Sequence, residues 1–213
     1  EGNKISSMIY NRGMNENNGH NLAGSIYFEL QPIQNLIFRS SFGYSMNAGS
    51  YRAYQPVYEL SKTAFRDEGM DVTSQSMWSG YQWSWENTLS YNFKLGTNHN
   101  FTALLGTSAE RNGLGISMSG GNIGSLFADF EHAYLDNNPT IDVANTSVGG
   151  NPWGEGGLIS YFGRLSYTFR EKYMATAILR ADASSNFAKG NRWGYFPSFS
   201  AGWVVSEENF FLN

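Results

Sequence analysis

The sequence has 213 residues, of which 15% are charged and 16% aromatic, and its formal net charge is −4. An average soluble chain has about 25% charged residues, so this one is poor in charge, although its mean hydropathy of −0.40 is not that of a greasy protein. The acidic balance excludes a basic surface for nucleic acid. Cysteine is absent, which excludes disulfide scaffolds, thiol catalysis and cysteine-based zinc sites.

No run of about 18 apolar residues occurs, so no transmembrane helix is predicted. Membrane-spanning β-strands need only about 10 residues each, with alternating character. The first four residues show no signal peptide, as expected both for a mature secreted protein and for a piece of a longer chain.

The first predicted hairpin covers residues 22–45, where apolar and polar residues alternate with a period of two. Its turn, residues 31–35, contains Pro32, as expected because proline cannot donate a ladder hydrogen bond. The apolar positions are Leu22, Ile26, Phe28, Leu30, Leu36, Phe38, Phe42 and Tyr44.

Two further hairpins and a seventh strand follow with the same alternation. Residues 83–109 reverse at a turn over 96–99, residues 159–182 reverse at 170–172, and the last strand is expected over 195–206. The positions expected to face outward include Leu89, Leu105, Leu165 and Leu179.

The connections between the predicted strands alternate in length. Three are tight turns, whereas the others are long, at roughly 46–80, 113–157 and 186–194, with a short helical turn expected around 125–135. Outer-membrane barrels have this asymmetry, with short periplasmic turns and longer extracellular loops, and structureless loops of this length are uncommon in compact domains.

Aromatic residues gather where the interfaces of a membrane would lie. Tyr91, Phe93, Tyr167, Phe169 and Tyr173 are close to tight turns, as in a periplasmic aromatic girdle. Trp83 and Trp85 are at the other end of their strand, where the outer girdle belongs. The pattern predicts an all-β fold: an antiparallel up-and-down transmembrane β-barrel segment of about seven strands.

Seven strands cannot close a bacterial barrel, because single-chain barrels have an even number. A sheet edge in lipid leaves unsatisfied backbone groups that cost several kcal/mol each. Further strands are therefore expected on both sides, with residues 11–21 read as a loop.

Residues 161–211 carry motifs that resemble the SusC/RagA family of TonB-dependent outer-membrane transporters of Bacteroidota. The matching stretches are 161–167 (YFGRLSY), 172–177 (KYMATA), 180–187 (RADASSNF), 191–203 (NRWGYFPSFSAGW) and 206–211 (SEENFF). Ala183 stands where the family usually has glycine, a small departure. Residues 32–43 also resemble a family hairpin.

The resemblance implies a barrel of about 22 strands in the bacterial outer membrane, with an N-terminal plug that is not within residues 1–213. It also implies import of oligosaccharides or peptides, with energy relayed by TonB and a SusD-like surface lipoprotein as partner. The other expected contact is outer-membrane lipid. Neither a cofactor nor an enzymatic activity is expected.

Two groups of residues are candidates for function. Arg164, Arg180 and Asp182 fall on the polar face, where they are expected to point into the lumen and to pair across strands or brace the plug. The loop aromatics are expected to stack on sugar rings or pack on peptide side chains, or else to pack against other loops or the lipoprotein; these are Trp78, Tyr81, Phe127 and Trp153.

No metal site is predicted. Asp129, Glu131, Asp136 and Asp142 make one loop acidic, but their spacing matches no EF-hand, so Ca²⁺ there is only a weak alternative. The three histidines, His20, His99 and His132, are far apart in the sequence.

Two other classes of protein stay open. An outer-membrane barrel enzyme would need a catalytic set on an outer loop, but residues 115–119 (GISMS) do not form a nucleophile elbow. A soluble β-sandwich that binds glycans would cover the outward leucines with a second sheet.

Overall fold

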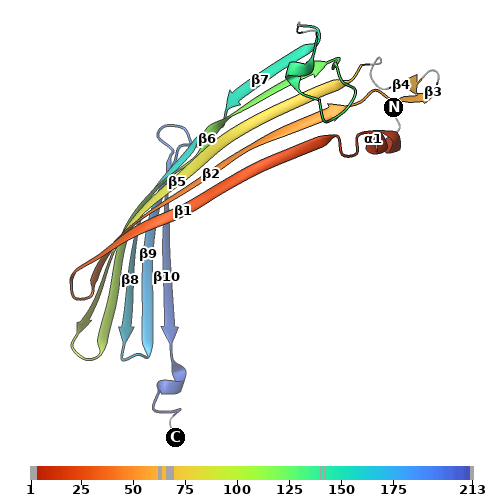
Figure 1. Ribbon diagram of the computed structural model, residues 1–213. Helices are drawn as coiled ribbons and strands as arrows, with labels where there is room; N and C mark the ends of the chain where they lie inside the picture. The colour runs from red at the N-terminus through yellow and green to blue at the C-terminus, as the bar shows by residue number, and fades with distance from the viewer. Residues whose placement is uncertain (1–3, 62–63, 66–69, 140, 142, 212–213) are drawn as a thin grey trace. The chain divides into compact units, whose positions relative to one another are not determined.

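The computed structural model describes residues 4–61, 64–65, 70–139, 141 and 143–211. Most of them are in strands (Figure 1), as residues rich in alternating aromatic and β-branched side chains should be. In chain order the elements are α1 (Lys4–Tyr10), β1 (Asn15–Ile33), β2 (Leu36–Gln55), β3 (Glu59–Ser61), β4 (Ala64–Phe65), β5 (Val72–Leu95), β6 (His99–Ile123), η2 (Leu135–Asn137), β7 (Thr146–Pro152), β8 (Gly156–Phe169), β9 (Tyr173–Ser184), β10 (Trp193–Trp203) and η3 (Val205–Glu207).

The long strands form one sheet in the order β1-β2-β5-β6-β8-β9-β10, with β7 also paired to β6. The pairings of β6, β8, β9 and β10 are antiparallel, and each of these long strands lies beside the next long strand of the chain. Strands β3 and β4 make a separate small hairpin. This up-and-down arrangement confirms the predicted all-β class and the seven predicted long strands. Among the described residues, no helix has the length and hydropathy needed to cross a membrane.

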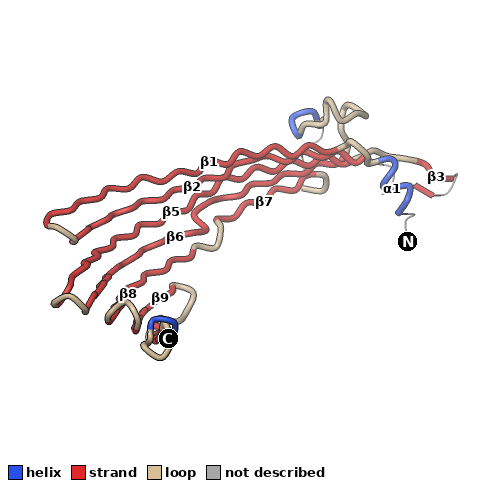
Figure 2. The backbone as a smooth tube through the Cα atoms, turned by 90° about the horizontal axis from the view of Figure 1, so that it is seen from below, coloured by secondary structure: helices blue, strands red, loops and turns tan. Residues whose placement is uncertain are grey.

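Three tight turns join β1 to β2, β5 to β6 and β8 to β9, as short links in Figure 2. Each turn uses left-handed backbone: Asn35 has φ 67°, Gly96 has φ 66°, and Arg170 and Glu171 have φ 50° and 60°. Asparagine and glycine tolerate this region well. Arg170 and Glu171 adopt it because the tight turn from β8 to β9 requires a positive φ at both positions. The first turn occupies residues 34–35, shorter than the predicted 31–35.

The loop predictions were wrong in extent. Strand β2 continues to Gln55 and β5 begins at Val72, inside the predicted loop 46–80; β6 continues to Ile123 and β7 occupies 146–152, inside the predicted loop 113–157. Strand β1 begins at Asn15 within the expected loop 11–21, and α1 precedes it. These extensions carry polar residues on both faces, so backbone pairing continues without the apolar alternation that marks a half-buried strand.

Two shorter predictions also need correction. In place of a helical turn around 125–135, residues 126–130 are bends and a 3₁₀ turn runs from Leu135 to Asn137. The last strand begins at Trp193 and ends at Trp203, and residues Val205–Glu207 form a 3₁₀ turn instead of continuing to Ser206 in the strand.

The chain divides into two compact units, which are described separately. Unit 1 comprises residues 1–22, 46–81 and 114–154, and unit 2 comprises residues 23–45, 82–113 and 155–213. The buried hydrophobic residues among those described are Tyr54 and Ala133, both in unit 1. The described residues of unit 2 therefore form no buried apolar core, and many of their apolar side chains lie on the surface.

Backbone register shows how unit 2 sorts its side chains. Leu105 pairs with Gly163, which pairs with Leu179; Phe101 pairs with Tyr167, which pairs with Ala175. Because facing residues share one side of a sheet, the predicted outward positions form continuous rows across β6, β8, β9 and β10. We call this side of unit 2 the apolar face, and the other side the polar face.

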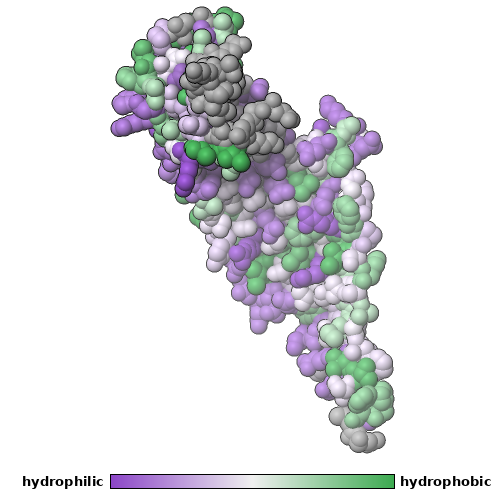
Figure 3. All heavy atoms as spheres, turned by 90° about the vertical axis from the view of Figure 1, so that its right-hand side faces the viewer, coloured by the Kyte–Doolittle hydropathy of each residue, from purple (hydrophilic) through white to green (hydrophobic). Residues whose placement is uncertain are grey.

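Within the described residues, the leucines of the apolar face are open: Leu105, Leu165 and Leu179 are 65%, 47% and 56% exposed, whereas the soluble-sandwich alternative expects a second sheet over them. Figure 3 shows one side of the surface, where the end nearest the C-terminus is mostly hydrophobic or neutral in colour, in agreement with the exposed Trp203, Phe210 and Phe211.

Near the tight turns the aromatic rings form a ladder across unit 2. Tyr91, Phe93, Phe101 and Tyr167 stack in sequence, with ring centres 4.8–5.4 Å apart. The ladder continues through His99, Phe169, Tyr173 and Trp203. The predicted clustering of aromatics at this end thus becomes a continuous band, the arrangement that stabilises a barrel at a membrane interface.

Candidate functional site

Arg180 of β9 is the centre of a polar cluster on the polar face of unit 2. Its Nε donates hydrogen bonds to the two carboxylate oxygens of Asp182 at 2.8 and 2.9 Å, and its Nη2 donates to the Ser160 hydroxyl at 3.0 Å. Phe162 is the register partner of Arg180, and the guanidinium lies 5.6 Å from the centre of its ring. Ser160 is fully buried, so one side of the guanidinium is fixed while the side chain stays 44% exposed.

Phe162 owes its position to a glycine on the neighbouring strand. Gly106 is its register partner on β6, and a methyl group on Gly106 would overlap the phenyl ring. The ring therefore occupies the space beside Gly106, and Arg180 lies over it. Phe162 was not among the predicted site residues. The sequence signal that could have indicated it is its spacing of two residues from both Ser160 and Arg164, which places all three on one face of the strand.

Arg164 is on the same face but does not join the cluster. Its register partner is Ile178, and it makes no hydrogen bond or ion pair with any residue that the structure describes. Of the three predicted lumen-facing charges, Arg180 and Asp182 are brought together on one strand, and Arg164 presents an exposed guanidinium beside them.

A broad groove of about 530 Å³ also opens on unit 2. Strands β1, β2, β5 and β6 line it with small and polar residues, among them Ser25, Ser45, Gln82, Ser84, Glu110 and Asn112. Hydroxyl, amide and carboxylate groups in such a groove can hydrogen-bond polar ligands or water.

Trp78 and Trp153 lie on glycine positions of unit 1. The indole of Trp153 covers Gly80 and Gly115, and the backbone N–H of Trp153 donates to the Gly115 carbonyl at 2.9 Å. The indole of Trp78 lies where a side chain on Gly49 would be. Both rings are half-buried, so each presents one part to solvent. Tyr81, the last residue of unit 1 in β5, is 44% exposed.

Phe127 belongs to a segment, residues 124–138, that we call the clasped loop. Backbone hydrogen bonds hold its ends: Gly124 N–H donates to Asp71 O at 3.0 Å and Leu126 N–H to Asn137 O at 2.9 Å. The Leu135 N–H donates to Gln75 Oε1 at 2.8 Å, and the Leu135 side chain packs on Gly120. The loop is thus tied to β5 and β6 of unit 1.

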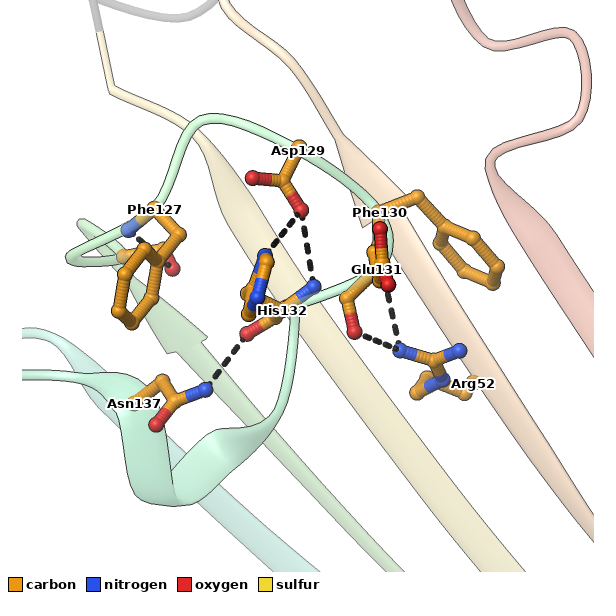
Figure 4. Close-up of polar contacts among 8 residues, drawn as sticks. Arg52, Phe127, Asp129, Phe130, Glu131, His132 and Asn137 are labelled. Atoms are coloured by element: carbon orange, nitrogen blue, oxygen red, sulfur yellow. Dashed lines mark hydrogen bonds and ion pairs between the residues drawn. The ribbon is translucent and has the colours of Figure 1, made fainter.

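Arg52 of β2 is the main anchor of the clasped loop (Figure 4). Its Nη1 donates to Phe130 O at 2.8 Å and to Glu131 O at 3.4 Å, and its guanidinium lies 4.1 Å from the Phe130 ring centre and 4.3 Å from that of Tyr134. Its Nη2 contacts Glu16 at 3.2 Å. The side chain is only 13% exposed. The sequence prediction missed Arg52, because residues 46–80 were read as a loop.

The tip of the clasped loop carries Phe127, 41% exposed, against His132 with ring centres 4.8 Å apart. The His132 backbone N–H donates to Asp129 Oδ1 at 2.9 Å and the ring Nδ1 lies 2.9 Å from the same oxygen (Figure 4). These two hydrogen bonds, the backbone one first, hold the pKa of Asp129 below its ordinary value. Within the described residues, no three acidic, histidine or cysteine side chains gather as metal ligands; Asp142 lies outside them.

Glu208 is a second anchor that the sequence did not indicate. The Tyr173 hydroxyl donates to its Oε1 at 2.5 Å, the Trp203 indole N–H donates to the same oxygen at 3.1 Å, and Lys172 Nζ lies 4.0 Å from Oε2. The hydrogen bond from Tyr173, then that from Trp203, lowers the pKa of Glu208. This carboxylate fixes the segment after β10 to the aromatic ladder.

Comparison with known sequences gives relatives of one kind. No family model matches the chain. The chain is 28% identical to the TonB-dependent receptor P26 of Formosa agariphila over 219 residues, which cover 99% of this chain and 20% of that receptor. A stretch of 53 residues, 25% of this chain, is 55% identical to the TonB-dependent receptor SusC of Bacteroides thetaiotaomicron and covers 5% of it.

Solved structures show the same fold. The chain superposes on the structure of the RagAB peptide transporter with a TM-score of 0.79 and 19% sequence identity, over 94% of this chain and 21% of that one. The chain spans about a fifth of the length of the curated relatives that match along most of it. The curated relatives are named as TonB-dependent receptors, which supports the prediction that the chain is not an enzyme.

Proposed function

The chain is a SusC/RagA-like segment of a TonB-dependent receptor of the outer membrane, and from this premise we propose that it forms part of the barrel wall of a nutrient importer. The observation that carries the proposal is the likeness to TonB-dependent receptors along nearly the whole chain. The two-faced rows of unit 2 support it, because a barrel wall needs lipid on one side and a polar lumen on the other. In this proposal the chain supplies barrel wall only, and the plug that meets TonB lies elsewhere in the receptor.

The proposed cargo is an oligosaccharide or a peptide, taken up with energy relayed by TonB and with a SusD-like lipoprotein as the surface partner. The SusC-like stretch supports this choice, as does the likeness to a structure described as a peptide transporter. The polar face supports it too, because the groove on unit 2 offers hydroxyl, amide and carboxylate groups. Both sugars and peptide backbones are recognised by such groups.

Two sets of residues are proposed to meet cargo or plug. Arg164 is the proposed contact for a carboxylate of the plug or of the cargo, because its guanidinium is exposed and unpaired among the described residues. Arg180 and Asp182, which satisfy each other, are proposed to shape the lumen wall. The proposed substrate contacts of the outer region are Trp78, Tyr81, Phe127 and Trp153.

Uptake in the source bacterium tests the import proposal. Deleting the receptor gene should abolish growth on one class of polymer, either a glycan or a protein digest, supplied as sole carbon source, and deleting tonB should give the same defect. The receptor tagged at its C-terminus should bring down a surface lipoprotein from detergent-solubilised membranes. Normal growth of the deletion strain on every polymer that the wild type uses would contradict the proposal.

A point variant then tests the outer aromatics. Phe127→Ala should lower the uptake rate of labelled cargo, because it removes an exposed ring. Val143→Ala is the matched control, since Val143 is an exposed apolar residue of the same unit without a ring. Equal uptake by both variants would remove Phe127 from the proposed contacts.

A further inference from the structure

A crevice of about 280 Å³ lies on the apolar face of unit 2, at the ends of β8 and β9 away from their tight turn and beside the middle of β5 and β6. Backbone register places Ala109, Ile159 and Ala183 side by side in one row across β6, β8 and β9. The two alanines leave a hollow beside the larger Ile159 and the indole of Trp83, and Gly157 lines the same hollow. The exposed atoms of the crevice are almost all apolar.

Two arginines line the same crevice. Arg111 is the register partner of Gly157, so it lies on the apolar face two residues beyond Ala109, and Arg192 comes from the connection before β10. A basic residue beside apolar residues on a lipid-facing surface is costly near the middle of a bilayer but favourable at its polar boundary.

Neither arginine is fully engaged. Arg111 forms an ion pair with Glu155 through one Nη atom, and half of its side chain is exposed. The Arg192 Nε–H donates to the Phe187 carbonyl at 3.1 Å, and neither Nη atom hydrogen-bonds to a residue that the structure describes. Since a guanidinium has five N–H donors, both arginines can still bind an anion. Glu155 pairs with Arg111, and Glu110, the other acidic residue at the crevice, alternates with Ala109 and Arg111 and so belongs to the polar face.

The aromatic residues near the crevice indicate at what level of the membrane it lies. The rings of Tyr161 and Trp193 stack at 5.9 Å on the same face, and Trp83 forms one side of the crevice. Tyrosine and tryptophan gather at the headgroup level of membranes. Because the tight turns of such barrels are periplasmic, this band is at the outer leaflet.

We propose that the crevice binds a phosphorylated, acylated glycolipid of the outer leaflet, with an acyl chain along Ala109, Ile159 and Ala183 and a phosphate held by Arg111 and Arg192. A guanidinium matches the geometry of a phosphate and forms charge-assisted hydrogen bonds with it. The inference rests on the membrane placement in the proposed function, and it is independent of transport.

Native mass spectrometry of the receptor that carries this chain, extracted from outer membranes in mild detergent, tests the site. The probe is lipid A with two phosphates, titrated in parallel with phosphatidylglycerol and phosphatidylethanolamine. The wild type should bind lipid A in preference to both. The double variant Arg111→Gln and Arg192→Gln should weaken that binding by about tenfold or more, because two charge-assisted contacts are lost.

Two single variants separate charge from shape. Ala183→Phe fills the hollow with an apolar ring and changes no charge, so it should also weaken binding of lipid A. Lys94→Gln removes one positive charge at the end of β5 next to the tight turn, away from the crevice, and should leave binding unchanged.

The outcomes distinguish this inference from the proposed function. A receptor recovered from membranes that binds lipid A equally well with and without the two arginines refutes the lipid site alone. Preference for phosphatidylglycerol over lipid A would overturn the choice of a glycolipid. Recovery of the receptor as a soluble species without detergent would refute the membrane placement and both proposals with it.

Discussion

Leu105 lies in the middle of the apolar face of unit 2, so an arginine there tests whether this face meets lipid. Its row, with Gly163 and Leu179, is halfway between the aromatic row of Phe101 and the row of Ala109, which lies near Tyr161 and Trp193. The distance from Phe101 to Ala109 is about 27 Å along the strand at about 3.4 Å per residue. With a strand tilt of about 40°, this gives about 20 Å of height, close to the apolar band of an outer-membrane barrel.

The magnitude follows from this depth. Arginine on the lipid face near the bilayer midplane costs about 2–4 kcal/mol, which lowers the ratio of folded to unfolded receptor by about 25- to 700-fold. Ser198→Arg is the matched control, because Ser198 is exposed on the polar face in the neighbouring row, opposite Ile178. A surface substitution of this kind should change stability by no more than about 0.5 kcal/mol.

The measurement is the denaturant midpoint of the full receptor in phospholipid vesicles, followed by tryptophan fluorescence and by the gel mobility of the folded barrel. Leu105→Arg should shift the midpoint strongly, and Ser198→Arg should hardly shift it. If both variants lost stability equally, or if Leu105→Arg had no effect, the assignment of the two faces would be wrong.

Three further predictions concern single contacts. Gly80→Ala should displace the Trp153 indole that lies on Gly80 and cost about 1–3 kcal/mol, measured by denaturation and by a change in tryptophan emission; Gly154→Ala, where nothing lies within 4 Å, is the control. Arg52→Ala should release the clasped loop, so that amide hydrogen exchange rises across residues 124–138 and stays unchanged in unit 2. The pKa of Glu208 is lowered, so its carboxylate contributes its full stability above the ordinary glutamate pKa of about 4.3, and this contribution is lost as the pH falls through the lowered pKa. Acid should therefore change the fluorescence environment of Trp203, and Glu208→Gln should remove that change. An unchanged acid response in the variant would refute the role of Glu208.

The amino-acid sequence determined the parts of this chain where one strand face is apolar. From residue 83 onwards the alternation placed Leu105, Leu165 and Leu179 on one side, and the strand register confirms that these positions share a face. Period-two alternation is readable because a one-residue slip would move every apolar side chain to the polar side. The motifs after residue 161 indicated the SusC/RagA resemblance for the same part of the chain.

Only the tertiary structure decided where the strands of unit 1 end and what holds its loop. Residues 46–55 and 72–80 mix polar and apolar residues on both sides, so no alternation distinguishes a strand from a loop there. Backbone pairing with neighbouring strands makes them strands. Arg52 and Phe130 are 78 residues apart in sequence, and the ring contacts and hydrogen bonds between them exist only because β2 passes beneath the clasped loop. Long-range contacts of this kind depend on chain topology, which local residue order does not encode.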